Sequence, residues 1–309
     1  MTTKGKTLKE FKKQFSLHLF VWAGLLFLLL FSIIPMLGVL IAFNDYKIKT
    51  GFVGMFHGPW VGLKHFKAFI SNRKFATLMR NTLSISVLKM LFSFPLPIIF
   101  SIMISEMRSA KFKRIVQTAS YLPHFISWTI VAGLFYAFFS TNNGLVNILL
   151  MNLGLIKDPI PLLIDENYYY FLAVASEIWK EMGWSAIIYL AAISGIDPSL
   201  YESAQIDGAG RFQRIWHVTL PCIRGTISIL LIMSIGDLFS GNFDQAMLLG
   251  NSLNVNRSEI IDVFVYKTGL SQGRYSFAAA AGLFQSVISL VLVLIANSTS
   301  KKLSGASLF

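Results

Sequence analysis

Residues 202–221 decide the fold of this chain, and they read ESAQIDGAGRFQRIWHVTLP. Asp197 is placed just ahead of them to cap a short helix. Gly208 permits backbone angles that are closed to other residues, so we expect a turn there. An amphipathic segment follows, and we expect Pro221 to end it, because proline cannot continue a helix. The stretch therefore predicts a compact helix–turn–helix.

The composition around this stretch is typical of a membrane protein. Of 309 residues, 54% are hydrophobic and 14% are charged, whereas charged residues make up about a quarter of a soluble domain. A membrane-spanning helix needs about 20 mostly apolar residues. Six segments meet that need: 17–43, 79–105, 115–139, 169–194, 225–249 and 276–299. We interpret the first as a retained helix, because it is too long for a signal-peptide core. The sequence predicts one all-α integral membrane domain over residues 17–302.

The positive charges indicate how this domain is oriented. Fourteen of the 27 lysines and arginines fall in short segments on one side: Lys4, Lys6, Lys9, Lys12, Lys13, Arg108, Lys111, Lys113, Arg114, Arg211, Arg214, Arg224, Lys301 and Lys302. The positive-inside rule assigns that side to the cytoplasm. The other side holds eleven, seven of them in or beside the long loop 44–78, where the rule loses force. We expect the terminal segments 1–16 and 303–309 and the loop 195–223 to be cytoplasmic. Such dispersed charge does not indicate a nucleic-acid partner.

The spacing within the loop carries a family resemblance. Glu202-Ser203-Ala204, three residues, Gly208, nine residues and Val218-Thr219-Leu220-Pro221 resemble the EAA loop of ABC-importer permeases. Ser203 and Val218 depart from the family pattern conservatively. Further segments are similar to maltose-type carbohydrate permeases, in particular those of oligosaccharide and complex-polysaccharide importers: Tyr121-Leu122-Pro123-His124, Gly144-Leu145-Val146-Asn147 and Tyr275-Ser276-Phe277-Ala278-Ala279-Ala280.

The resemblance implies a six-helix type I ABC-importer transmembrane domain with a cytoplasmic coupling helix, in a bacterial cell membrane. It also implies a second permease subunit, commonly non-identical, an external sugar-binding protein, and two ABC ATPase subunits that use ATP and Mg²⁺. The residues it assigns to ATPase coupling are Glu202, Ser203, Ala204, Asp207, Gly208, Leu220 and Pro221.

The sequence does not indicate an enzyme or a bound cofactor. Gly5-Lys6-Thr7 resembles the end of a phosphate-binding loop, but the required earlier glycine is missing. The five histidines show no metal-ligand spacing, and no nucleophile motif occurs. We therefore expect no catalytic residue and no metal site in this chain.

Charged residues inside the predicted spans are the candidates for a substrate path. Lys89, the group at 177–181 and Asp237 fall about 12–18 Å deep in a core of about 30 Å. Charges at that depth are costly and face a cavity or one another. With two tryptophans that offer stacking or packing surfaces, the candidates are Lys89, Glu177, Trp179, Lys180, Glu181, Trp184 and Asp237. If the charges only neutralise one another, we expect the pairs Glu177–Lys180 and Lys89–Glu181.

The predicted function is transport of an oligosaccharide through half of an ATP-driven import path. An importer for another solute, or a self-sufficient channel or secondary transporter, is the alternative. The sugar's charge stays open: basic residues outnumber acidic ones eleven to seven on the outer face, which favours an anionic glycan. Glu177, Glu181 and Asp237, however, outweigh Lys89 and Lys180 within the spans.

Overall fold

The computed structural model describes residues 13–304. These residues are almost wholly helical, and they contain an isolated β-bridge between Asn44 and Trp60 but no β-sheet. The chain divides into two compact units, residues 1–70 with 268–283 and residues 71–267 with 284–309. Of the predicted cytoplasmic segments 1–16 and 303–309, residues 1–12 and 305–309 lie outside the described residues.

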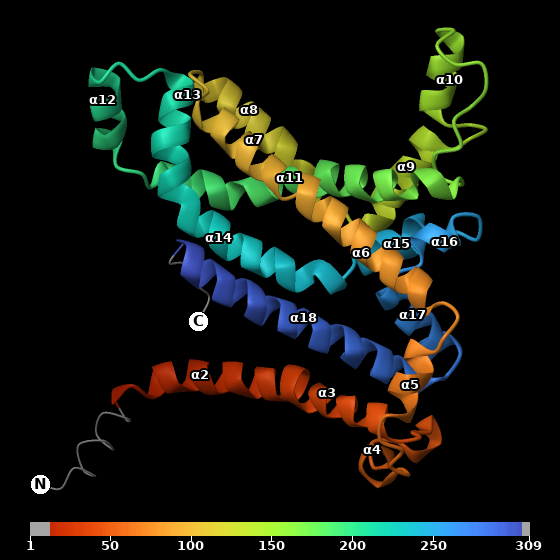
Figure 1. Cartoon of the computed structure of the whole chain (residues 1–309). Coiled ribbons are helices and arrows are strands. Elements are labelled where there is room, and N and C mark those ends of the chain that lie inside the picture. The colour runs from red at the N-terminus through yellow and green to blue at the C-terminus, as the bar shows by residue number, and fades with distance from the viewer. Residues whose placement is uncertain (1–12, 305–309) are drawn as a thin grey trace, which may run out of the picture. The chain divides into compact units, whose positions relative to one another are not determined.

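The first unit begins with one long apolar helix (Figure 1). It consists of α2 (Phe15–Leu28), a π turn (Leu29–Ile33), α3 (Ile34–Met36) and a 3-10 segment (Leu37–Phe43), and its candidate membrane span is Leu17–Phe43. The short helices α4 (Gly54–His57) and α5 (Lys64–Ile70) follow. The buried Asn44 holds this loop, because its Nδ2 donates to the carbonyl of Met55 at 2.7 Å.

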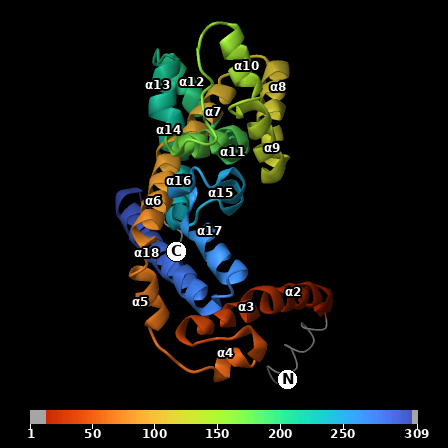
Figure 2. The same ribbon diagram turned by 90° about the vertical axis from the view of Figure 1, so that its right-hand side faces the viewer.

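The second unit holds most of the other helices (Figure 2). They are α6 (Phe75–Phe92), α7 (Pro95–Ser105), α8 (Ala110–Tyr121), α9 (Trp128–Phe139), α10 (Leu145–Asn152), α11 (Tyr169–Ser194), α12 (Pro198–Ile206), α13 (Arg211–Arg214), α14 (Leu220–Gly236), α15 (Phe243–Leu249), α16 (Val255–Ser258) and α17 (Ile261–Tyr266). The last helix, α18 (Tyr275–Ser304), belongs to this unit from Phe284 onward.

Helix α11 is the centre of the second unit and packs against α6, α7, α8 and α14. A Cβ on Gly183 would come within 2.1 Å of the Ser120 carbonyl, so glycine lets α8 and α11 approach closely. Near the loop 195–223, Ile102, Ile193 and Ile223 form a buried cluster that joins α7, α11 and α14. These contacts hold the loop and the middle of the bundle in one unit.

Helix breaks in the structure correct two predicted spans. Segment 115–139 is two helices, Ala110–Phe125 and Trp128–Phe139, bent by 103°. The bend follows Pro123, and the Ser127 hydroxyl caps the second helix. Segment 225–249 ends its first helix at Phe239 and resumes at α15. Pro95 and Pro97 predict a break or kink in 79–105, and the structure confirms it, because α6 ends at Phe92 and α7 begins at Pro95.

Two local predictions are also wrong. Pro221 does not end a helix, since Arg211–Phe239 is continuous. The π turn Ile215–Thr219 precedes it, so the proline lies in the first turn of α14, where its missing N–H matters least. The stretch Ser258-Glu259-Ile260-Ile261 also predicts a capped helix that begins at Ser258 and ends near Gly269, but Ser258 ends α16, and α17 starts at Ile261.

Four helices are long and apolar enough to cross a membrane, and the bent α8–α9 pair would make a fifth. Helix α11 has 26 residues. Every 18-residue window of it contains Glu177, Lys180 and Glu181. Its crossing of the membrane, and hence the total of six spans, stays a prediction.

Candidate functional site

The predicted helix–turn–helix is present between α11 and α14. Asp197 caps α12, and its Oδ1 accepts from the backbone N–H of Ser199 at 2.9 Å. The N–H and then the hydroxyl of Ser199 hold the pKa of the Asp197 carboxyl below its usual range. Gly208 has φ +77°, the left-handed conformation expected of the turn. The N–H of Ala209 closes the turn by donating to Ala204 at 2.8 Å.

Two side-chain contacts fix this loop, one within the loop and one between the loop and the bundle. The hydroxyls of Tyr201 and Thr219 are 3.0 Å apart, which joins α12 to the π turn. Arg211 Nε lies 3.6 Å from the Glu106 carboxylate, just beyond the end of α7. The loop is therefore fixed at both of its helices.

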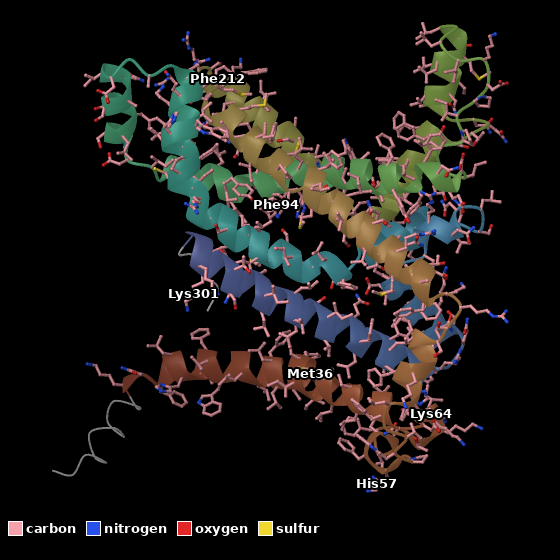
Figure 3. All side chains as sticks on the ribbon, in the orientation of Figure 1. Met36, His57, Lys64, Phe94, Phe212 and Lys301 are labelled. Atoms are coloured by element: carbon pink, nitrogen blue, oxygen red, sulfur yellow. The ribbon has the colours of Figure 1, made fainter. Side chains whose placement is uncertain are left out.

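The free surface of the loop is partly acidic and partly apolar. Glu202, Ser203 and Asp207, which the family resemblance assigns to ATPase coupling, are exposed. Ile206 and Phe212 are 86% and 87% exposed, and Phe212 lies at the start of α13 (Figure 3). Sequence reasoning missed this apolar surface, although apolar residues on both sides of the glycine turn were a signal for it. Leu220 instead packs inward against the cluster of Ile102, Ile193 and Ile223, so it supports the loop from beneath.

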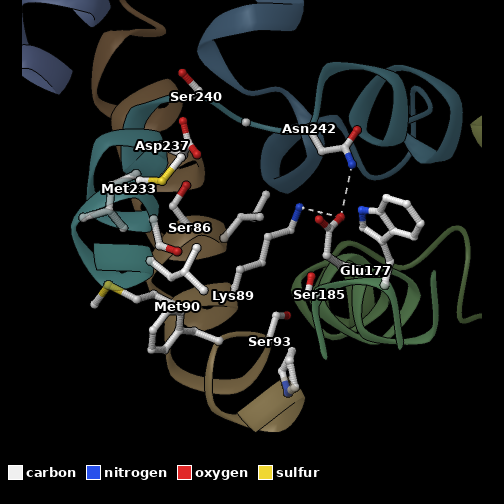
Figure 4. A pocket seen from close by; sticks show the side chains of 18 of the residues that line it. Ser86, Lys89, Met90, Ser93, Glu177, Ser185, Met233, Asp237, Ser240 and Asn242 are labelled. Atoms are coloured by element: carbon white, nitrogen blue, oxygen red, sulfur yellow. Dashed lines mark hydrogen bonds and ion pairs between the residues drawn. The ribbon is translucent and has the colours of Figure 1, made fainter. Parts of the chain in front are cut away.

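A cavity of about 680 Å³ lies in the second unit. It is lined by residues of α6, α7, α11 and α14 and by the broken segment 240–242. Four of the seven predicted path residues line it: Lys89, Glu177, Trp184 and Asp237. Three distant segments of the sequence thus bring one cation and two carboxylates to the same cavity (Figure 4).

The charge pairs at the cavity differ from the expected ones. Lys89 Nζ lies 3.2 Å from Glu177 Oε2 and 2.9 Å from Gln245 Oε1. The same Glu177 oxygen accepts from Asn242 Nδ2 at 3.1 Å. Sequence reasoning missed Asn242 and Gln245, because both follow a helix break that it did not predict.

The other three path candidates do not line the cavity. Lys180 is 5% exposed and donates to the His124 carbonyl at 2.7 Å and to Glu181 at 2.9 Å. His124 Nδ1 lies 2.6 Å from Glu181, so this group pins the bend before α9 to α11. The Trp179 ring packs edge-on against Phe135. Lys180, Glu181 and Trp179 therefore hold α11 against α9 and against the bend that precedes it.

Trp184 connects that group to the cavity. Its ring stacks on His124 with the centroids 4.3 Å apart and the planes parallel. One ring face is thereby covered, while the residue also lines the cavity. Trp184 is thus a fixed aromatic surface beside the charged groups.

The comparisons with known proteins agree on a family. Residues 93–305 match the family described as binding-protein-dependent transport system inner membrane component. "Protein LplB" of Bacillus subtilis (strain 168) is 44% identical, over 96% of this chain and 92% of that protein. The "Polygalacturonan/rhamnogalacturonan transport system permease protein YteP" of the same organism is 42% identical, over 94% and 89%.

A solved structure with a similar fold gives the same result. It is a chain of a bacterial ABC transporter involved in the import of the acidic polysaccharide alginate. The TM-score is 0.87 at 38% identity, and the match covers 97% of this chain and 99% of that one. A second structure of an alginate ABC transporter, in complex with an alginate pentasaccharide-bound periplasmic protein, matches with the same TM-score at 37% identity.

Proposed function

Because the chain belongs to the binding-protein-dependent inner membrane components, the permease subunits of ABC importers, we propose that it forms half of the path for an acidic oligosaccharide. Its relatives include proteins named for polygalacturonan, rhamnogalacturonan and alginate transport. Lys89 supplies a cation at the cavity wall, where a sugar carboxylate would bind. Trp184 offers a stacking surface for the ring.

The observation that carries this proposal is that two helices run without interruption between the loop and the cavity. One helix, Arg211–Phe239, begins at the turn and reaches Asp237 in the cavity wall. Helix α11 connects Glu177 to the start of the loop in the same way. A displacement of the loop is therefore transmitted to the cavity by rigid helices.

The proposed partners are those of a type I ABC importer. One of two separate ATPase subunits, which use ATP and Mg²⁺, docks on the loop 195–223 through Glu202, Ser203, Asp207 and the exposed apolar side chains. A second, non-identical permease completes the path, and an extracytoplasmic sugar-binding protein delivers the substrate. The loop and both termini face the cytoplasm. The EAA-type loop argues against a self-sufficient channel, which has no need of it.

The experiment is purification of the detergent-extracted complex, followed by mass spectrometry of every subunit and uptake assays in proteoliposomes. We expect an ABC ATPase, a second permease and ATP-dependent uptake of a uronate oligomer presented with its binding protein. A complex that lacks an ATPase, or uptake driven by an ion gradient without ATP, would contradict the proposal. Uptake of a peptide or polyamine instead of the oligomer would support the alternative solute class.

A further inference from the structure

The ammonium group of Lys89 has hydrogen-bonding capacity left over. It has three N–H donors, and its acceptors among residues 13–304 are Gln245 Oε1 and Glu177 Oε2. The side chain is 17% exposed and lines the cavity. One donor is therefore available to a ligand that enters the cavity.

Gln245 is a fixed partner of this ammonium. It is 2% exposed, and its Nε2 donates to the Ala173 carbonyl and the Ser176 hydroxyl, both at 2.7 Å. A carbonyl only accepts, so the amide nitrogen must face Ala173 and the amide oxygen must face Lys89. Lys89 thus keeps its position whether or not Glu177 contacts it.

Glu177 is the partner that a ligand can replace. Its side chain is 21% exposed and lines the cavity. One oxygen, Oε2, accepts from both Lys89 and Asn242. A carboxylate on a sugar has the same two-oxygen geometry, so it can take the acceptor position of Glu177 on Lys89.

We propose that Glu177 is the specificity-determining residue of this half of the path, because it competes with the substrate carboxylate for Lys89. The inference rests on the proposed function and extends it. The charged residues that line the cavity are Lys89, Glu177 and Asp237, one cation against two carboxylates. Glu177 therefore weakens the binding of an acidic sugar, and a transport path needs weak binding so that the substrate can leave.

The test compares a uronate oligomer with its neutral counterpart in the reconstituted complex. Glu177→Gln keeps an acceptor for Lys89 and Asn242 but removes the charge. We expect the uronate concentration that half-saturates uptake to fall about 5-fold, the size of one partly solvated charge contact, with less than about 2-fold change for the neutral oligomer. Asp158→Asn is the matched control, since it removes one exposed carboxylate of the outer loop that does not line the cavity.

Equal changes for both oligomers in Glu177→Gln would overturn the proposal, as would the same gain in Asp158→Asn. If the wild-type complex takes up neither oligomer, the proposed function fails. A second measurement then still tests the role of Glu177. The complex is titrated with glucuronate or with glucose, and the fluorescence change of Trp184 is obtained by subtracting the signal of the Trp184→Phe variant. Tighter glucuronate binding in Glu177→Gln supports the competition, and unchanged binding refutes it.

Discussion

The hydroxyl oxygens of Tyr201 and Thr219 lie 3.0 Å apart, and they join the helix before the glycine turn to the π turn after it. Thr219 is 2% exposed, whereas the end of α12 faces solvent. The contact therefore ties an exposed helix to the buried base of α14. A force on α12 reaches α14 through this hydrogen bond as well as through the chain.

Tyr201→Phe tests whether this tie transmits the motion. A neutral hydrogen bond of this kind contributes about 1 kcal/mol, so its loss shifts a two-state equilibrium about 5-fold. We expect a similar fall in ATPase stimulation by the loaded binding protein, with normal assembly. Tyr168→Phe is the control, because the hydroxyl of this exposed tyrosine has no hydrogen bond within residues 13–304. If both variants behave alike, the tie has no role in coupling.

Gly208 provides a second test of the loop. Its φ of +77° is strained for any other residue, although a Cβ there would meet open space. Gly208→Ala should therefore cost about 1–2 kcal/mol in the turn, and uptake and stimulated ATPase activity should fall together. Gly208→Asp adds a charge at the docking surface and should be more severe. Membrane insertion should survive in both variants.

Gly225→Ala is the control for that experiment. Gly225 lies inside α14, and its Cβ would also meet open space. The same substitution in a helix is neutral or slightly stabilising. Normal transport in Gly208→Ala, or equal loss in Gly225→Ala, would argue against a special role for the turn.

Local signals in the sequence predicted much of the second unit. Helix α11 covers the segment 169–194 that hydropathy had marked, and Asp197 caps α12 as its residue type indicated. The break at 240–242 is marked in the sequence by Ser240-Gly241-Asn242, but the mean hydropathy of the segment 225–249 does not register it. The Gly241 N–H instead donates to Asp262 Oδ2 at 2.8 Å. This hydrogen bond stabilises the break and joins residues that are 21 positions apart in the sequence. Hydropathy is a local property of the sequence, so it does not predict such a contact.

The orientation of the chain can be tested by thiol labelling in a Cys222→Ser background. Cysteines at Asn143 and Leu253 should react with an impermeant reagent on intact cells, and one at Gln213 should react only after the membrane is opened. Leu253 is chosen because it is 64% exposed, whereas the nearby Ser258 is 3% exposed and would stay unlabelled on either side. Labelling of Gln213 on intact cells would reverse the proposed topology.

At the cavity too, the sequence predicts the features that depend on one helix and misses those that depend on contacts between helices. Depth along the helices selected Lys89, Glu177 and Asp237, which do line one cavity, but it also selected Lys180 and Glu181, which do not. The pairing was wrong because it depends on rotation of the helices about their axes, which places Lys180 against the bend before α9. The spacing of residues along a single helix does not predict how that helix is rotated about its axis.

Lys89→Met tests the charge of the substrate. Methionine has a similar length but no charge, so the cavity loses its cation and keeps two carboxylates. We expect uptake of a uronate oligomer to fall by about 10-fold, as for loss of one charge-assisted hydrogen bond. Uptake of the neutral counterpart should change little.

The single variant leaves Glu177 without its cation, which by itself destabilises a partly buried carboxylate. The double variant Lys89→Met/Glu177→Gln separates this effect from recognition, because it restores neutrality at the pair. We expect it to recover thermal stability and neutral-sugar uptake, while uronate uptake stays low. Equal loss for both sugars in the single variant, with equal recovery in the double, would assign Lys89 to ion pairing rather than to the substrate.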